Sequence, residues 1–339
     1  MNSRPVVTTL LLLAASAFAC QGRGESQGGA TVPRQVVTYE WDTVFVAGGS
    51  SVNDTLFAGP HRLALTDDLV VVGDDMASRV IALDRSTGAV KWTFGRPGGG
   101  PKEFRGIADI AVSRRGMIWV LDFGNGRIAE LSPGGEFRGV RTLHHLPAPP
   151  AALLPLDQRI IAMSPGAARP FMEIGYDSLV LQSSFRLEWP DSISRLANTR
   201  VHLAAGPGDS WVSAFALGPG FTIWQHDTPS PHRYREDIPF ASRVSREIRN
   251  AGADSARYGA VAIAVANEEI FMLFGGRPAR RAHPSEPTHW IDVYDIGGNY
   301  SRSYRLPFNT QAMVTDGRVF FVLPAEGVPR LIALRPDQE

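Results

Sequence analysis

The sequence predicts an all-β protein: a closed, six-bladed β-propeller with four antiparallel strands in each blade. An internal repeat and the spacing of short β-type runs predict it. The segment "DDMASRVIAL", residues 74–83, returns as "DFGNGRIAEL", residues 122–131, and both segments lie within longer units that contain four short runs. Four strands in roughly 40 to 50 residues is the period of a propeller blade.

Turn residues separate the expected strands of the first two units. β-type runs at 62–65, 69–73, 79–83 and 89–94 alternate with the turn segments "TDD", "DDMAS" and "RSTG". The next unit repeats this scheme at 107–112, 117–122, 127–131 and 137–140. Short β-branched and aromatic runs between Gly, Asp and Asn are typical of antiparallel strands.

Later units are more degenerate but keep the same period. The centres expected for the second strand of each blade are Val71, Trp119, Ile161, Val212, Phe271 and Phe320. The interval between the fourth and fifth centres is the longest and contains a helix-like stretch. We therefore expect a propeller over residues 36–339, with a helical segment inserted near 239–258.

Closure of the ring requires a strand from the other end of the chain. The last unit lacks a fourth strand, whereas "VVTYEWDTVFVA", residues 36–47, is a spare one. Placed as the outer strand of the last blade, it closes the ring and leaves only short, protected edges.

The first twenty residues are typical of an export signal. The apolar run from Val6 to Ala19 is too short to span a bilayer. "ASAFAC" resembles a bacterial lipobox, although Ala17 stands where leucine is usual, and this resemblance implies cleavage before Cys20 and lipid on that cysteine. The alternative is an ordinary signal peptide, cut near "SAFA", that leaves a free thiol.

The expected organisation is a lipoprotein signal peptide over 1–19, a flexible tether over 20–35 and the propeller. The tether is rich in Gly and Gln and buries too little apolar surface to fold. Gln21, rather than Asp, follows the cysteine. We expect a secreted protein, lipid-anchored to a bacterial membrane, at the periplasmic face of the outer membrane or at the cell surface.

Composition excludes several functions. Lys+Arg and Asp+Glu both total 34, so the global charge predicts no nucleic-acid partner. Cys20 is the only cysteine, so the propeller has no disulfide or thiol chemistry. "GRPGGGPK" lacks the ending of a phosphate loop, and no His-Glu-x-x-His or Gly-x-Ser-x-Gly motif occurs.

Charge placement predicts one basic face. In a propeller, the loops between second and third strands share a face with the connections between blades. Two long segments of these classes carry the candidate binding residues Arg243, Arg246, Arg249, Arg277, Arg280, Arg281 and His283. The other turns carry Asp67, Asp68, Asp157, Asp209, Glu268 and Asp316. The basic face suits a protein, peptide or glycan with anionic groups; the alternative is solvated loops without a partner.

Residues 95–137 resemble an NHL repeat: Gly-Pro-x-x-Phe, an inner strand, a turn, a strand that ends in Asp, then Arg-Ile. The whole chain is similar to secreted or lipid-anchored six-bladed propellers of bacteria. We expect Asp74 with Arg79, and Asp122 with Arg127, to be structural pairs that flank a tight loop.

Two functions remain open. The first is a binding or scaffold module at a membrane, and no motif requires catalysis. The second is a metal-dependent enzyme, because similar propellers include calcium-dependent lactonases and a zinc-dependent lyase of amidated peptides. The starts of the inner strands offer His61, Asp109, Asn198, His202 and Gln311. That mixture matches no ligand set of those enzymes, so no cofactor is identified, and calcium or zinc is expected only under the enzyme alternative.

Overall fold

The structure is a computed structural model of the 339-residue chain. It describes residues 32–37, 40–49, 51, 53–165, 167, 169–176, 179–185, 200–216, 218, 220–226, 228–235, 259–275 and 288–337. The predicted signal peptide, Cys20 and the predicted helical insertion near 239–258 lie outside the described residues.

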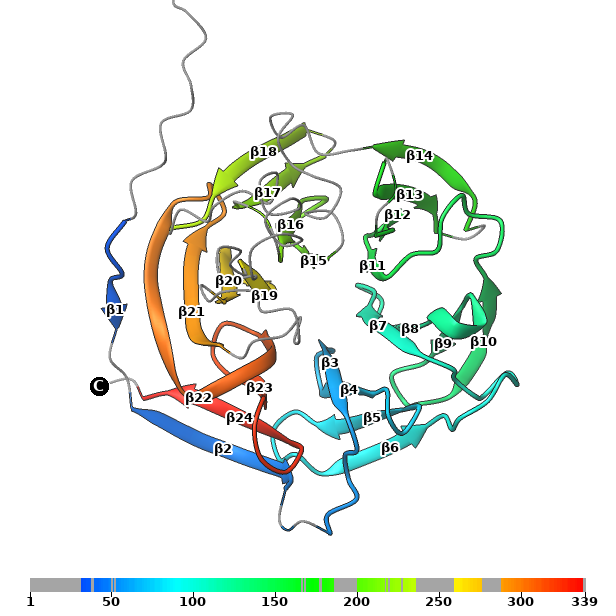
Figure 1. The fold of residues 1–339 in the computed structure, drawn as a ribbon, viewed down its shortest axis with the longest axis horizontal. Coiled ribbons are helices and arrows are strands. Elements are labelled where there is room, and N and C mark those ends of the chain that lie inside the picture. The colour runs from blue at the N-terminus through cyan, green and yellow to red at the C-terminus, as the bar shows by residue number, and fades with distance from the viewer. Residues whose placement is uncertain are drawn as a thin grey trace, which may run out of the picture.

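The chain is a six-bladed β-propeller, as the sequence predicts (Figure 1). Blade 1 contains β3 (Pro60–Leu65), β4 (Leu69–Asp74), β5 (Arg79–Asp84) and β6 (Val90–Phe94). Blade 2 contains β7 (Ile107–Val112), β8 (Ile118–Asp122), β9 (Arg127–Leu131) and β10 (Phe137–Thr142), with the short 3-10 turn η1 (Phe123–Asn125) after β8.

Blades 3 and 4 are also separate four-stranded antiparallel sheets. Blade 3 contains β11 (Ala152–Pro155), β12 (Arg159–Met163), β13 (Phe171–Gly175) and β14 (Leu181–Phe185). Blade 4 contains β15 (Val201–Ala205), β16 (Trp211–Phe215), β17 (Gly220–Gln225) and β18 (Thr228–Arg233). The outer strand β18 carries Pro229 and Pro231, which lack the N–H groups that pairing with another chain requires.

Blades 5 and 6 share one long strand. Their other strands are β19 (Ala260–Ala266), β20 (Glu269–Phe274), β21 (Thr288–Asp295), β23 (Phe320–Pro324) and β24 (Arg330–Pro336). The shared strand β22 (Tyr300–Thr315) pairs first with β21 and then with β23. All six expected second-strand centres fall within β4, β8, β12, β16, β20 and β23, so the sequence period is confirmed.

The N-terminal strand closes the ring. β2 (Trp41–Gly48) pairs antiparallel with β24, from Trp41 opposite Pro336 to Gly48 opposite Arg330. The start of the predicted closing strand behaves differently, because β1 (Val36–Val37) pairs in parallel with β22 of blade 5. Closure from the N-terminus is therefore confirmed, while the closing strand begins at residue 41 rather than at 36.

The core is divided among the six interfaces between neighbouring blades. Among the described residues, six buried apolar clusters occur, one for each pair of neighbouring blades. The cluster between blades 6 and 1 joins Val70 and Val72 of β4 to Phe321 and Leu323 of β23. Each such side chain contributes roughly 1.5–3 kcal/mol when it is fully buried. Each blade buries both faces, so second strands such as β4 and β8 carry continuous apolar runs.

The two faces of the ring differ in the elements that they display. The starts of the inner strands, the loops between second and third strands, and the connections between blades lie on one face. We call it the channel-mouth face. The remaining turns lie on the opposite face. The alternation follows from the antiparallel order of each blade.

Candidate functional site

The six innermost strands surround the centre of the ring: β3, β7, β11, β15, β19 and the second half of β22 (Figure 1). Residues of all six strands line a central channel. Its cavity has a volume of about 350 Å³. Each innermost strand is the edge of its blade, so part of its backbone N–H and C=O groups has no partner strand. Side chains at the strand starts bind some of these groups and form the rim of the mouth.

The rim begins with contacts from blade 6 to blade 1 and from blade 1 to blade 2. Gln311 donates its side-chain amide to the carbonyl oxygen of Pro60, 3.3 Å away. His61 Nε2 lies 2.8 Å from the carbonyl oxygen of Ile107. Because a carbonyl only accepts, this contact places the proton of a neutral His61 on Nε2.

The rim continues from blade 1 through blade 2 to blade 3. Arg62 donates its Nε–H to the carbonyl oxygen of Ala108, 2.7 Å away. Asp109 accepts a hydrogen bond of 2.9 Å from the backbone N–H of Leu153. His61, Asp109 and Gln311, which were expected at the channel, therefore lie there and join neighbouring blades. His202 also lines the channel. Asn198 lies outside the described residues.

Asp109 is the carboxylate of the mouth. Burial raises its pKa to about 6, while Arg62 and the backbone N–H groups of Leu153 and Ile110 oppose the rise. The Nε atom of Arg62 lies 3.7 Å from Asp109 Oδ1. The Asp109 side chain keeps 19% of its surface exposed, and it lines the channel. The charge of Asp109 at the mouth therefore changes near pH 6.

The two histidines of the mouth are uncharged at neutral pH. Burial lowers the pKa of His61, and Arg62 lowers it further. Burial lowers the pKa of His202 well below its usual value, and Arg200 and Arg62 act in the same direction. Within the described part of the chain, His61 Nδ1 and His202 Nε2 are buried and have no hydrogen-bond partner. Such atoms favour an ordered water or a polar ligand group in contact with them.

The chemistry of the mouth suits a polar or anionic ligand group. Arg62 and Arg200 line the channel, and guanidinium N–H groups bind carboxylates, phosphates and sulfates. Neither arginine was predicted from the sequence, although each lies within two residues of a predicted channel histidine. Within the described residues, no group of three His, Cys, Asp or Glu side chains is placed to hold a metal ion.

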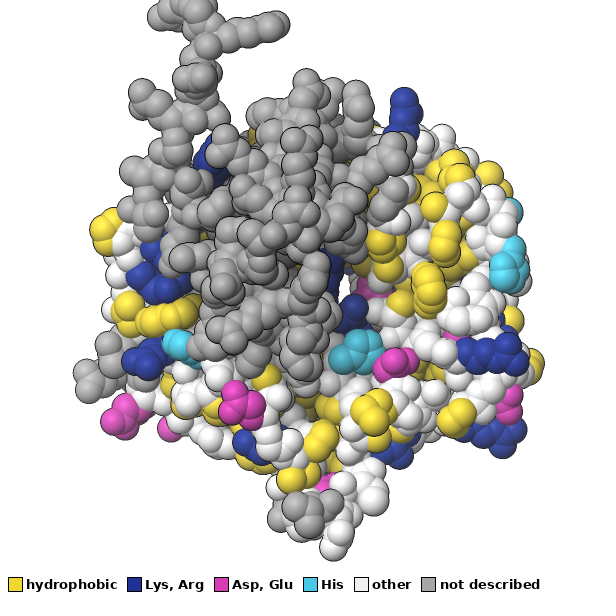
Figure 2. All heavy atoms as spheres, in the orientation of Figure 1, with side chains coloured by type: hydrophobic (Ala, Val, Ile, Leu, Met, Phe, Trp, Pro, Cys, Tyr) yellow, Lys and Arg dark blue, Asp and Glu magenta, His cyan; other side chains and the backbone are white. Residues whose placement is uncertain are grey.

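Apolar side chains are exposed beside the mouth. Met76 keeps 78% of its surface exposed and Phe123 keeps 50%. Both belong to loops tied to the entry of β7, since Asp75 accepts from the N–H of Ile107 and Phe123 donates to the carbonyl of Gly106, each at 2.8 Å. A cavity of about 250 Å³ lies next to Phe123, lined by Leu121, Phe123, Gly126, Leu143, His144, Leu146, Pro149 and Pro150. Figure 2 shows charged, histidine and hydrophobic side chains around the central opening of this face.

Asp122 and Arg127 of blade 2 bind the segment that leads into the first strand of that blade. Arg127 Nε lies 3.0 Å from Oδ2 of Asp122, whose carboxylate is completely buried. Arg127 also donates to the carbonyl oxygens of Gly100 and Glu103, at 2.6 and 2.7 Å. Asp122 accepts from the N–H of Arg105 at 3.1 Å. The loop and the incoming connection are thus held as one unit.

The loop pair of blade 1 makes equivalent contacts. Arg79 Nε lies 3.7 Å from Oδ2 of the buried Asp74. Asp74 accepts from the backbone N–H groups of Ala58 and Gly59, at 2.8 and 2.7 Å. Arg79 donates to the carbonyl oxygen of Leu56, 2.8 Å away. The repeated Asp and Arg therefore connect each loop to the segment that enters its blade.

The seven residues of the predicted basic face lie outside the described residues: Arg243, Arg246, Arg249, Arg277, Arg280, Arg281 and His283. Two described neighbours of those segments lie side by side, because the Gly275 N–H donates to the carbonyl oxygen of Gly259 at 2.7 Å. Both are on the channel-mouth face, since they flank the paired residues Ala260 and Phe274. The basic face itself stays a prediction.

Several acids of the opposite face are paired with arginines. Asp157 lies 3.0 Å from Arg114 Nη1, and Asp209 lies 2.9 Å from Arg159 Nη2. Asp316 pairs with Arg85. The opposite face is therefore less acidic than its carboxylates alone indicate.

Comparison with known proteins agrees with the fold. The model of the DUF5128 family, described as a 6-bladed beta-propeller, matches residues 51–159, which contain blades 1 and 2 and the start of blade 3. These are the blades in which the sequence repeat is clearest. Among curated proteins, no sequence matches this chain. None of the described residues form a helix with the length and apolar character of a membrane span.

Three solved structures share the architecture at low sequence identity. A candidate exported protein from Bacteroides fragilis has a TM-score of 0.60 and 11% identity, over 88% of this chain and 96% of its own. A DUF4221 family member from Bacteroides vulgatus has a TM-score of 0.57 and 9% identity, over 89% and 99%. Virginiamycin B lyase from Staphylococcus aureus has a TM-score of 0.53 and 11% identity, over 88% and 100%. Identities this low show the fold alone.

Proposed function

We propose that the protein is a lipid-anchored, extracytoplasmic propeller that binds a protein, peptide or glycan with anionic groups. The binding surface is the channel-mouth face, and the lipid is attached to Cys20. The proposal assigns binding or scaffolding, rather than catalysis, to this protein. The described geometry supports a surface with both apolar and cationic groups.

The observation that carries the proposal is the gathering of exposed apolar and polar groups around one mouth. Met76 and Phe123 expose apolar surface on loops that are fixed to β7. Exposed apolar surface on a fixed support is typical of interaction sites. Arg62 lies at the same mouth and offers N–H donors to an anionic group. The combination suits a partner with an apolar part next to a negative charge.

The magnitudes show why several groups must act together. An exposed ion pair contributes roughly 0–1 kcal/mol, so one arginine gives little affinity. Burial of an exposed Phe or Met side chain contributes roughly 1.5–3 kcal/mol. Apolar contact by Met76 and Phe123 is therefore expected to supply most of the affinity, while the guanidinium groups select an anionic partner.

A pair of matched variants tests this surface. Phe123→Asp and Val180→Asp each introduce one carboxylate at an apolar side chain of similar exposure, 50% and 55%. Phe123 lies on the channel-mouth face, whereas Val180 lies in the turn between β13 and β14 on the opposite face. Immobilised Phe123→Asp protein should retain less partner from a membrane extract than wild type, and Val180→Asp protein should retain as much. Equal retention by all three proteins contradicts the proposed surface.

The second candidate is a metal-dependent propeller enzyme, either lactonase-like or similar to a lyase of amidated peptides. It is favoured by the fold shared with virginiamycin B lyase and by uncharged histidines beside a carboxylate at the mouth. Elemental analysis after dialysis with calcium or zinc separates the candidates. Stoichiometric metal in the wild type that is lost in Asp109→Asn favours the enzyme.

A further inference from the structure

Residues 32–37, which we call the strap, lie along the outer edge of blade 5. Val36 and Val37 pair in parallel with Ser303 and Tyr304 of β22. The Ser303 N–H donates to the carbonyl oxygen of Gln35 at 2.8 Å, and the Gln35 N–H donates to the Tyr300 hydroxyl at 2.9 Å. The strap is thus an added strand. Residues 32–35 were expected to end a flexible tether, but they contact the propeller.

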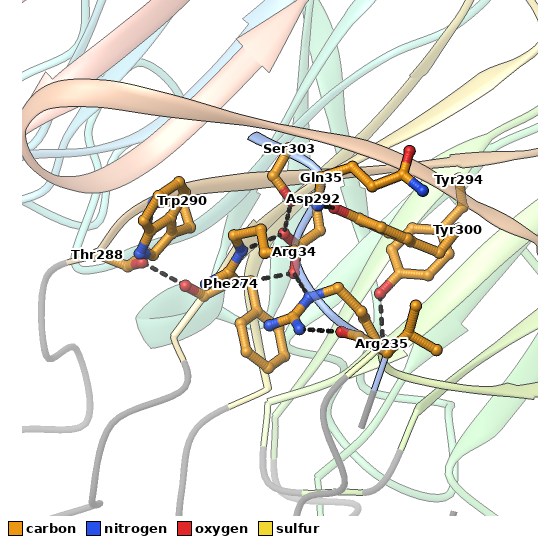
Figure 3. Close-up of polar contacts among 11 residues, drawn as sticks. Arg34, Gln35, Arg235, Phe274, Thr288, Trp290, Asp292, Tyr294, Tyr300 and Ser303 are labelled. Carbon is orange, nitrogen blue, oxygen red and sulfur yellow. Dashed lines mark hydrogen bonds and ion pairs between the residues drawn. The ribbon is translucent and has the colours of Figure 1, made fainter. Parts of the chain in front are cut away.

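Arg34 inserts its side chain into blade 5 (Figure 3). Its Nε and Nη2 atoms donate to the two carboxylate oxygens of Asp292, both at 3.1 Å. The guanidinium carbon lies 4.4 Å from the ring centre of Trp290 and 5.9 Å from that of Phe274. A bidentate carboxylate beside an aromatic face is specific for a guanidinium group.

The buried carboxylate of Asp292 also contacts two residues outside the strap. Asp292 is completely buried, and Ser303 Oγ donates to its Oδ1 at 2.5 Å. Arg235 Nε lies 3.7 Å from its Oδ2, and the Arg235 side chain is only 3% exposed. The charge of Asp292 therefore stays paired when Arg34 leaves. The pocket does not depend on the strap for its countercharge.

The strap is recognised by its backbone and by one side chain. Its first residue is held through the backbone, because the Val32 N–H donates to the carbonyl oxygen of Arg235 at 3.1 Å. Val32 and Val36 leave 45% and 46% of their surface exposed. Main-chain pairing with one specific pocket is how sheet edges recognise extended peptides.

The closing strand is fixed independently of the strap. Trp41 Nε1 donates to the carbonyl oxygen of Arg305 at 2.8 Å, and its ring lies 5.5 Å from that of Phe320. The pairing of β2 with β24 begins at the same residue, Trp41. Release of residues 32–37 therefore leaves the ring closed.

We propose that this edge of blade 5 is a docking site for an extended peptide that carries an arginine. Residues 32–37 of the same chain are its resident ligand and are released without unfolding of the propeller. The site is separate from the channel mouth and does not rest on the function proposed for the mouth. Its ligand class follows from the pocket: a guanidinium for Asp292 and Trp290, and an extended backbone for Ser303.

The test uses the full chain with Arg34→Ala, which removes the anchoring side chain of the resident strap. The probe is a fluorescent peptide with the sequence of residues 31–38, TVPRQVVT. The control peptide has the same sequence with citrulline in place of arginine. The arginine peptide should bind this variant roughly 10-fold more tightly than wild type, whose pocket is filled. It should also bind roughly 10-fold more tightly than the citrulline peptide, which lacks the charge.

The control variant is Arg335→Ala, which removes an arginine that is 59% exposed and pairs with Asp42 at the surface. It should bind the peptide no better than wild type. Equal affinity of Arg34→Ala for the two peptides, or no binding by the folded variant, overturns the proposal.

Hydrogen exchange in the wild type gives a second test that needs no variant. The Ser303 amide, which donates to the strap, should exchange roughly 100-fold faster than that of Met272 at the centre of blade 5, because only the first is freed when the strap leaves. Equal exchange rates for the Ser303 and Met272 amides show that the strap leaves only when blade 5 itself opens. That result contradicts release of the strap from a folded propeller.

Discussion

Phe45 of the N-terminal strand β2 packs against Phe321 of blade 6, with their ring centroids 6.2 Å apart. Gly88 of blade 1 also lies against the Phe45 ring, because a Cβ added at Gly88 would clash with atoms of that ring. Phe45 is 8% exposed and belongs to the cluster between blades 6 and 1. One side chain from the start of the chain thus contacts the last blade and the first.

Phe45→Ala should destabilise the whole propeller, because it leaves a cavity where the ring closes. Loss of a buried phenylalanine costs about 3–5 kcal/mol. Val46→Ala on the same strand is the control, since Val46 is 52% exposed and its change should stay within about 0.5 kcal/mol. Urea denaturation measures both. Similar free energies of unfolding for the two variants contradict the closure.

Asp109 should make stability depend on pH. Its pKa is raised from 3.8 to about 6, so the folded protein holds the proton more tightly than the unfolded chain. The stabilisation from the protonated form is present at pH 4 and is lost as the pH rises through 6, by up to about 3 kcal/mol. Asp109→Asn should remove this loss. The free-energy difference between variant and wild type should therefore change between pH 4 and pH 7, and a constant difference contradicts the assignment.

Cys20→Ser tests the proposed anchor. If lipid on Cys20 holds the protein at the membrane, the variant should move from the membrane fraction to the soluble fraction after cell disruption. The propeller should keep the melting temperature of the wild type, because Cys20 lies in the predicted tether and outside the predicted propeller over residues 36–339. Retention of the variant in the membrane fraction contradicts the proposed lipid anchor.

The predicted basic face has its own test. Replacement of Arg246, Arg249, Arg280 and Arg281 by alanine should leave folding intact and abolish partner capture. Binding to wild type should weaken steeply with added salt, and the variant should lose most of this dependence, because exposed charge pairs are screened. If the quadruple variant captures its partner as well as the wild type does, these arginines are solvated surface.

The sequence was sufficient to predict the ring because the blade is a local pattern. Second strands such as β4 and β8 are buried on both faces and carry continuous apolar runs, which mark the period even where the motif fades. The closing strand at the N-terminus was predictable because the last unit lacked a fourth strand and the N-terminal segment supplied one.

Contacts between residues far apart in the sequence were not predictable in this way. Arg34 lies in a segment whose composition indicates a tether, and its partner Asp292 is 258 residues away. The same limit applies at the mouth. His61 and Asp109 were expected at the channel, but their bonds to neighbouring blades depend on how each strand edge faces the next.

A photo-crosslinking amino acid placed in blade 1 of the full chain tests whether the channel-mouth face is the binding surface. One variant carries it at Met76 on the channel-mouth face, and the other carries it at Asp68, an exposed turn residue on the opposite face. After irradiation of cells that express each variant, immunoblots measure covalent adducts. We predict an adduct from position 76 and none from position 68. An adduct from position 68 alone, or from neither position, contradicts the channel-mouth face as the binding surface.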